Sequence, residues 1–78
     1  MLNSPYMTNL ASTGAMGRDI RRRRESLGVT LQQLADLTGI GINTLSRLER
    51  GSSGVTLKTL LLVLQTLGLR LRIEAERN

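Results

Sequence analysis

The stretch GVTLQQLADLTGIGINTLSRLERG, residues 28–51, has the pattern of two short helices joined by a glycine-containing turn. Thr30 is placed to cap the first helix, and Gln33 stands three residues later, so each side chain can bond to the other's backbone N–H. Gly39 follows, and a glycine ends a helix at low cost because it readily adopts the left-handed conformation. The pattern predicts one helix over residues 31–38 and a second helix that begins after the next glycine.

The apolar residues of this stretch recur at the three- and four-residue steps of a helix. In the first helix the predicted buried stripe consists of Leu31, Leu34, Ala35, Leu37 and Thr38. In the second helix Leu45 and Leu48 are predicted to face inward, and Gly51 ends the helix. The remaining side chains of the second helix are predicted to fall elsewhere around its axis: Ile42, Asn43, Thr44, Ser46 and Arg47.

Three further segments complete the predicted bundle. Residues 1–14 show no sustained period and are predicted to form a flexible arm. Residues 15–27 form a helix in this prediction, because one face holds Met16, Ile20, Arg24 and Leu27. Thr56 can cap another helix over residues 57–67. The sequence therefore predicts an all-α bundle of about four helices over residues 15–68.

The segment LRLRIE, residues 69–74, alternates apolar and charged side chains at the period of a half-buried strand. Leu69, Leu71 and Ile73 fall on one face. A lone strand leaves both edges unpaired, and the economical partner is the same strand of a second copy. The sequence thus predicts a homodimer in which residues 69–78 form a dimerising strand and tail.

The amino-acid composition limits the functions that the chain can perform. A chain of 78 residues suits one domain with a small core, which dimerisation would enlarge. Cysteine and histidine are both absent, which excludes disulfides, zinc fingers and histidine acid–base catalysis, so we expect no catalysis, cofactor or metal. A net charge of +5 favours a polyanionic partner, while the single aromatic residue, Tyr6, argues against recognition by base stacking. Groove binding to duplex DNA remains open.

The sequence also bears on the cellular location of the protein and on other functional classes to which it could belong. The leucine-rich segment 57–69 is too short and too polar to span a bilayer, and we expect a cytoplasmic protein without a membrane partner. Two other classes stay open. One is a basic amphipathic protein on anionic membranes, and the other is an interaction module that sequesters a partner without binding DNA.

A family resemblance lies in residues 30–51, which read T-x-x-x-L-A-x-x-x-G-x-x-x-x-T-L-S-R-L-E-R-G. This run resembles the helix-turn-helix core of the Xre family, which includes the phage Cro and lambda-type repressors. Residues 56–68, TLKTLLLVLQTLG, are similar to the family's following helix. The resemblance implies a lambda-repressor-like bundle. One departure is Leu31, where the family often has a glutamine that helps to hold a phosphate.

The second helix of such a motif lies in the major groove, where each base pair displays a distinct pattern of donors and acceptors. Asn43 can pair bidentately with adenine, and Arg47 can do so with guanine. Ile42 or the methyl group of Thr44 can touch a thymine methyl. We therefore expect these four residues to contact bases; the alternative for each is a solvated helix face.

Phosphate contacts are expected at the edges of the motif and beside the base-contacting residues, at Thr30, Gln32, Gln33, Ser46, Ser52, Ser53 and Lys58. Capping alone also explains Thr30, and Ser52 and Ser53 could be turn formers. The resemblance further implies a structural ion pair between Arg24 and Glu49.

Two arginine-rich segments have several candidate roles. The run Arg21–Arg24 points in four directions on a helix, so its members cannot all face one partner. Arg70 and Arg72 could be solvated, contact DNA backbone or dock a partner protein, and solvation is favoured.

The resulting hypothesis is a dimeric repressor of transcription that occupies a palindromic operator, with half-sites roughly 34 Å apart. The ending GLRLRIE also resembles HipB-type antitoxins, which are Xre-family dimers whose partners are HipA-type kinase toxins. That resemblance implies a toxin–antitoxin pair. A free-standing Xre-family regulator without a toxin is the alternative.

Overall fold

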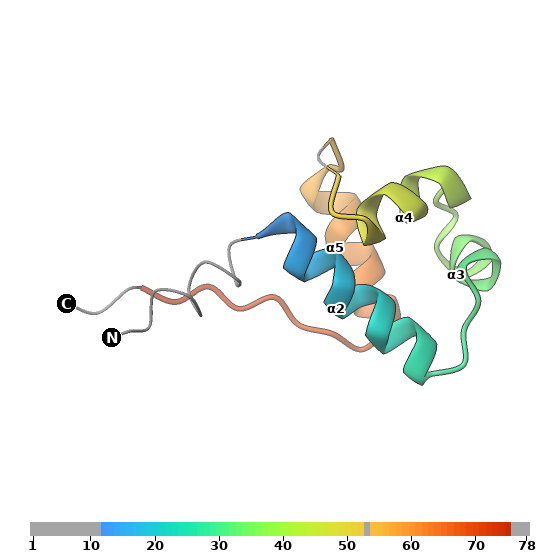
Figure 1. Cartoon of the computed structure of the whole chain (residues 1–78), viewed down its shortest axis with the longest axis horizontal. Helices are drawn as coiled ribbons and strands as arrows, with labels where there is room; N and C mark the ends of the chain where they lie inside the picture. The colour runs from blue at the N-terminus through green and yellow to red at the C-terminus, as the bar shows by residue number, and fades with distance from the viewer. Residues whose placement is uncertain (1–11, 53, 76–78) are drawn as a thin grey trace.

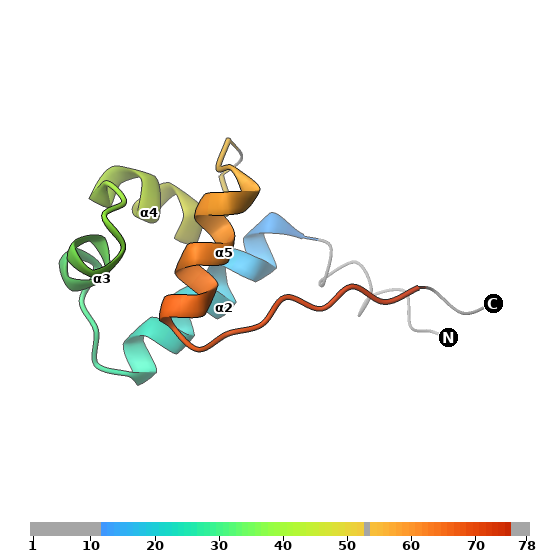
Figure 2. The same cartoon turned by 180° about the vertical axis from the view of Figure 1, so that it is seen from behind.

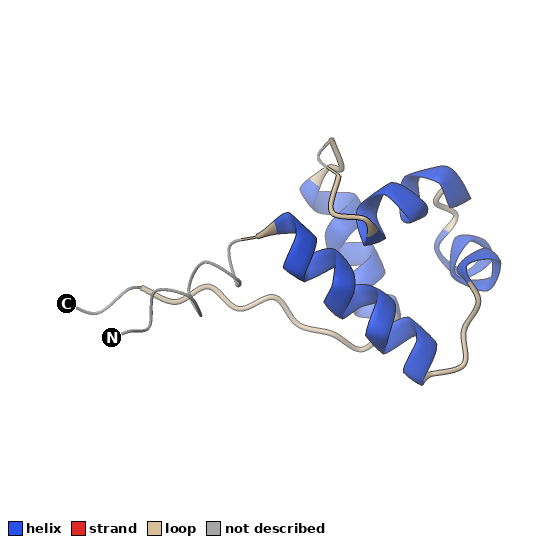
Figure 3. Ribbon diagram, viewed as in Figure 1, coloured by secondary structure: helices blue, strands red, loops and turns tan. Residues whose placement is uncertain are grey.

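The computed structural model describes residues 12–52 and 54–75. All regular structure in this part of the chain is helical (Figures 1 and 3), with four helices: α2 (Thr13–Ser26), α3 (Leu31–Thr38), α4 (Ile42–Glu49) and α5 (Leu57–Thr66). Among the described residues, no helix has the length and apolar character that crossing a membrane requires. The predicted four-helix bundle is confirmed.

The start and end of α3 agree with the sequence-based prediction. Thr30 Oγ1 accepts a hydrogen bond from the backbone N–H of Gln33 at 3.0 Å, and Gln33 Oε1 accepts one from the N–H of Thr30 at 2.8 Å. Gly39 ends the helix with a φ of 74°, in the left-handed region that favours glycine. The reciprocal hydrogen bonds of Thr30 and Gln33 and the left-handed Gly39 therefore set where this helix begins and ends.

The first and last helices differ slightly from the prediction. Helix α2 begins at Thr13, two residues before the expected start, because Ser12 Oγ accepts from the N–H of Ala15 at 3.2 Å and caps it. Helix α5 ends one residue early, at Thr66. There the N–H of Leu69 donates to the carbonyl of Leu64 at 2.7 Å and turns the chain away.

The core draws one fully buried side chain from each helix: Ile20, Leu34, Leu45 and Val63, all less than 2% exposed. Around them pack the other buried apolar side chains, Ala35, Leu48, Leu64 and Leu67. The prediction that Leu37 belongs to the buried stripe is wrong, because this side chain is 67% exposed. At about 100° per residue, Leu37 points well away from the direction shared by Leu34 and Ala35.

The predicted apolar face of α2 also needs a correction. Ile20 and Arg24 are buried as expected, but Leu27 is 46% exposed. Leu27 follows the last residue of α2 and keeps a helical backbone, with φ −87° and ψ −1°. It therefore stays on the predicted face, but it is not among the apolar side chains that pack against the core.

Helices α2 and α4 cross with their backbones nearly in contact. A Cβ atom on Gly17 would lie 2.6 Å from the carbonyl oxygens of both Leu48 and Glu49, a distance that real side chains do not adopt. The hydroxyl of Thr13 donates to the carbonyl of Gly51 at 2.8 Å across the same crossing. Glycine at position 17 therefore permits the approach that places α4 on α2.

Arg23 joins the ends of α2 and α5. Its Nε donates to the carbonyl of Leu67 at 2.8 Å, which satisfies one of the carbonyl groups left open at the end of α5. This arginine therefore contributes to the fold rather than to a free charged surface.

The tail leaves the C-terminal end of α5 (Figure 2). Leu69 packs partly against the core, whereas Leu71 is 40% and Ile73 is 91% exposed. No strand is formed by the described residues of this single chain, including residues 69–74. The strand and its pairing across a dimer therefore remain predictions.

We expect Gly17→Ala to destabilise the protein by about 1–3 kcal/mol, because overpacking at the crossing outweighs the higher helix propensity of alanine. The urea midpoint of unfolding, followed by circular dichroism, measures this change. Gly14→Ala is the matched control on α2, because its Cβ would meet only Arg18 and Ser12 side-chain atoms at 3.5 Å. A Gly17→Ala protein at least as stable as the wild type would contradict the close crossing.

Candidate nucleic-acid interface

Helix α4 has one anchored face and one open face. Leu45 and Leu48 are 1% and 8% exposed and fix the helix in the core. At about 100° per residue, Asn43 and Arg47 point in nearly the same direction, away from these leucines. Both are exposed. An amide and a guanidinium, one helical turn apart, therefore project from the surface of the molecule.

The other two residues expected to contact bases lie on the flanks of this open face. Ile42 is 38% exposed, and Thr44 is half-buried. Arg47 Nη2 donates to Thr44 Oγ1 at 3.4 Å, so the threonine also orients the arginine. The four expected residues are thus brought together on the first two turns of α4, with Asn43 and Arg47 projecting furthest.

The beginning of α4 carries no side-chain cap. Gly41 precedes the helix and cannot supply one, so within the described residues no side chain bonds to its first-turn N–H groups. These groups carry partial positive charge from the helix dipole. The end of α4 that presents Asn43 is therefore also its electropositive end.

The start of α3 holds three expected phosphate-contact residues, and all three already take part in local hydrogen bonds. Thr30 and Gln33 form the capping box, which leaves Nε2 of Gln33 as a donor. Gln32 Nε2 donates to Asp36 Oδ1 at 2.9 Å. A phosphate at this end would compete with that bond but not with the capping box.

The remaining expected phosphate contacts surround the end of α4 and the start of α5. Ser46 is half-buried, and its Oγ accepts from Arg50 Nη1. Ser52 and Lys58 are exposed. Ser53 lies outside the described residues. The structure thus leaves the side chains of Ser52 and Lys58 open to a partner.

A buried ion pair connects α4 to α2. Arg24 Nε donates to Glu49 Oε2 at 2.6 Å, and Arg24 Nη2 donates to Glu49 Oε1 at 2.9 Å. The two side chains are only 11% and 7% exposed. Arg24 Nη1 also donates to the carbonyl of Val29 at 2.9 Å, in the loop before α3. One guanidinium therefore connects both helices and the entry to α3.

The ion pair favours the protonated form of the Arg24 guanidinium. Hydrogen bonds from Arg24 to Glu49 raise the pKa of the guanidinium above its usual range, and they outweigh the opposing effect of burial. Arg24 therefore stays charged in the folded protein.

The charge on the open face of α4 is positive. Glu49 is the one acidic residue of α4, and it is buried and neutralised by Arg24. Arg47 is exposed, and so is Arg50, which directly follows the helix. On α2, by contrast, two exposed arginines are paired with acids: Arg21 with Glu25 and Arg22 with Asp19. The interface residues therefore favour an anionic partner.

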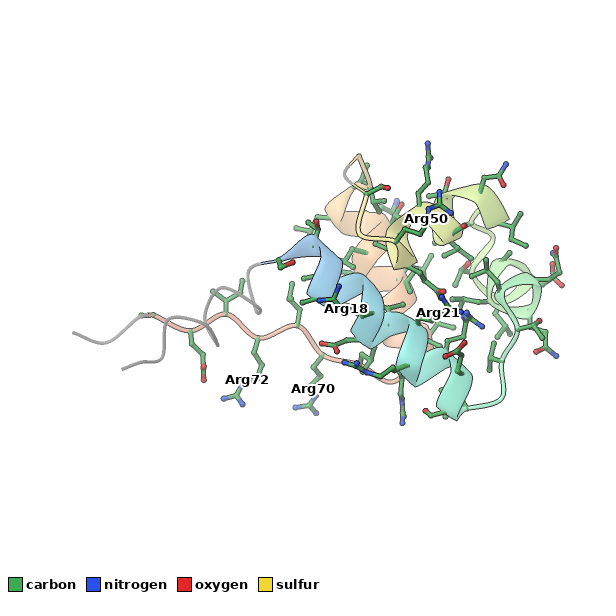
Figure 4. The ribbon with its side chains drawn as sticks, viewed as in Figure 1. Arg18, Arg21, Arg50, Arg70 and Arg72 are labelled. Atoms are coloured by element: carbon green, nitrogen blue, oxygen red, sulfur yellow. The ribbon has the colours of Figure 1, made fainter. Side chains whose placement is uncertain are left out.

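Arg50 is a functional candidate that the sequence-based prediction did not include. Its backbone is still helical, with φ −82° and ψ −2°, so it extends the direction set by Asn43 and Arg47. The sequence signal that could have identified Arg50 is its position three residues after Arg47, which places it on the same face of the helix. Arg70 and Arg72 instead project from the tail on the side of the molecule away from α4 (Figure 4).

Comparisons with known proteins agree with this geometry. A family model described as helix-turn-helix matches residues 20–73. A protein of Haemophilus influenzae, described as an uncharacterized HTH-type transcriptional regulator, is 39% identical over 66 residues. The matched region covers 85% of this chain and 65% of that relative, so the chain spans less than two thirds of the relative's length.

We expect Glu49→Ala to lower the free energy of unfolding by about 3–5 kcal/mol, because it leaves the buried Arg24 without its partner. Arg22→Ala is the control, since it removes an exposed ion pair worth at most about 1 kcal/mol. Urea unfolding of both variants measures the difference. Equal midpoints would show that the ion pair does not hold α4 in place.

Proposed function

Because the chain belongs to the helix-turn-helix family of Xre/Cro-type transcriptional regulators, we propose that it binds specific double-stranded DNA and regulates transcription. The observation that carries this proposal is the open face of α4. Asn43 and Arg47 project from a helix whose opposite face is anchored in the core and tied to α2 by a buried ion pair. Such rigidity is what precise base recognition requires.

In this proposal α4 lies in the major groove. Asn43 pairs with adenine and Arg47 with guanine, while Ile42 and the Thr44 methyl group contact thymine methyls. The uncapped, electropositive start of α4 enters the groove first. Backbone phosphates on either side are held by the hydroxyl, amide and ammonium groups of Thr30, Gln32, Gln33, Ser46, Ser52, Ser53 and Lys58.

The proposed assembly is a homodimer on a palindromic operator. Exposed Leu71 and Ile73 support this assembly, because pairing residues 69–74 with the same segment of a second copy would cover both side chains. Two-fold symmetry then places two α4 helices on half-sites roughly 34 Å apart. Occupation of the operator would repress transcription by excluding polymerase.

A finer proposal concerns a protein partner. The GLRLRIE ending, with Arg70 and Arg72 on the side away from α4, leaves a surface free for a second protein while DNA is bound. From the resemblance of this ending to HipB-type antitoxins, we infer that the partner is a HipA-like kinase toxin, which makes the chain the antitoxin of the pair. Co-purification with the product of an adjacent kinase gene tests it. Failure of the two purified proteins to associate would leave a free-standing regulator.

Selection of binding sites from random duplex DNA tests the main proposal. We expect an inverted repeat, and we expect the double variant Asn43→Ala plus Arg47→Ala to lose about 1–3 kcal/mol of discrimination for each contact while keeping non-specific binding. Arg22→Ala is the control and should select the same sequence. A pool without any preferred sequence would overturn base reading and favour an interaction module.

We also expect Ile73→Asp to convert the dimer into a monomer. The introduced carboxylate would lie on the apolar face of the two paired strands, with no opposite charge beside it. Sedimentation equilibrium measures the change in mass. Arg72→Asn is the control, since that side chain is expected on the solvated face of the strand. A variant at position 73 that dimerises as tightly as the wild type would contradict strand pairing.

A further inference from the structure

The hydroxyl group of Thr44 differs in its bonding from those of two other helical threonines. Thr38 and Thr66 are the last residues of their helices, and each donates to the carbonyl oxygen four residues earlier, at 2.8 Å. Within the described residues the hydroxyl of Thr44 makes no such bond to the backbone, and its oxygen accepts from Nη2 of Arg47 at 3.4 Å. The hydroxyl therefore serves a neighbouring side chain rather than the helix itself.

The position of this hydroxyl is set by the fold. A β-branched side chain has few favoured χ1 rotamers in a helix. Thr44 is half-buried, and it directly precedes Leu45, which is 1% exposed. Because Leu45 and Leu48 fix α4 in the core, the backbone that carries Thr44 is fixed as well. The hydroxyl oxygen is therefore a rigid acceptor on the surface of the helix.

Arg47, by contrast, is a long and exposed side chain with little else to hold it. The one acidic residue of α4, Glu49, is bound by Arg24. Within the described residues the bond to Thr44 is the one side-chain hydrogen bond that Arg47 makes. A side chain with many rotamers loses entropy when a ligand orders it, and this loss weakens binding. Ordering of Arg47 before binding reduces that loss.

The bond also determines which end of α4 the guanidinium occupies. Helical side chains lean towards the N-terminus, so the residue three positions earlier lies beneath Arg47. Thr44 is the third residue of α4. The bond therefore holds the guanidinium over the start of the helix, on the side from which Asn43 also projects. One of the five N–H donors of the guanidinium is used, and four remain for a base.

We propose that the hydroxyl of Thr44 positions Arg47 for base recognition, an inference that rests on the proposed function for the reading of bases. The hydroxyl directs the guanidinium to base edges, where it can donate to O6 and N7 of guanine. It thereby keeps the guanidinium away from the backbone phosphates, which carry no direct sequence information. This role belongs to the oxygen of Thr44 and is separate from the contact of its methyl group with thymine.

Two substitutions separate the oxygen from the methyl group. Thr44→Val removes the hydroxyl and keeps a methyl group in its place, whereas Thr44→Ser keeps the hydroxyl and removes the methyl group. Fluorescence anisotropy with the selected duplex and its single-base variants measures discrimination at each base pair. The variants Arg47→Ala and Asn43→Ala identify the base pairs that these two side chains read.

We expect Thr44→Val to lower discrimination at the base pair read by Arg47 by about 3–10-fold, the effect of leaving one long side chain unordered before binding. Thr44→Ser should retain that discrimination. Both variants should retain discrimination at the base pair read by Asn43. A general loss of stability would weaken binding to all sequences alike, so it would not produce this selective change.

Thr66→Val is the matched control. Thr66 is also half-buried but lies at the end of α5, and its substitution should leave every base preference unchanged. Full discrimination by Thr44→Val at the base pair read by Arg47 would overturn the positioning role and leave the proposed function intact. An equal loss in Thr44→Val and Thr44→Ser would also overturn it, because the hydroxyl would then not be the group that matters. A wild type without any base preference would overturn the proposed function itself.

Discussion

The buried ion pair between Arg24 and Glu49 holds the helices of the bundle in their relative positions. It joins residues 25 positions apart in sequence and connects α2, the entry to α3 and the end of α4. A charged pair in a small core is costly unless every donor and acceptor is used. Within the described residues no buried side-chain nitrogen or oxygen lacks a partner. The pair therefore ties α4 to α2 with its buried charges and polar atoms satisfied.

The glycine crossing acts together with the ion pair. Because Gly17 has no Cβ, the backbone of α2 comes close to the carbonyls at the end of α4, and the ionic contact of Arg24, about two turns further along α2, lies within reach. With that end fixed by backbone contact and charge, Leu45 and Leu48 set the rotation of the helix about its axis. Asn43 and Arg47 are then held outward by contacts that are buried within the bundle.

Much of this arrangement could be predicted from the sequence because the signals are local. The capping box of Thr30 and Gln33 and the inward leucines of α4 depend only on spacing along one helix, while the family resemblance supplied the ionic partner of Arg24. Gly17 and Arg23 could not be predicted, since their roles depend on which element crosses α2. Leu37 was misassigned because it is apolar and lies three residues after a buried leucine, yet α3 is covered on one side only.

In the proposed complex, α4 is held by the ion pair and the glycine crossing and is the surface that reads duplex DNA. Titration of the isotope-labelled protein with its selected duplex, followed by backbone amide chemical shifts in NMR spectra, tests it most directly. We expect the largest shifts along α4, at the start of α3 and in the loop that precedes α5, with α2 residues facing away from α4 unchanged. Shifts concentrated on the tail and the outer side of α2, with Asn43 and Arg47 unmoved, would contradict it.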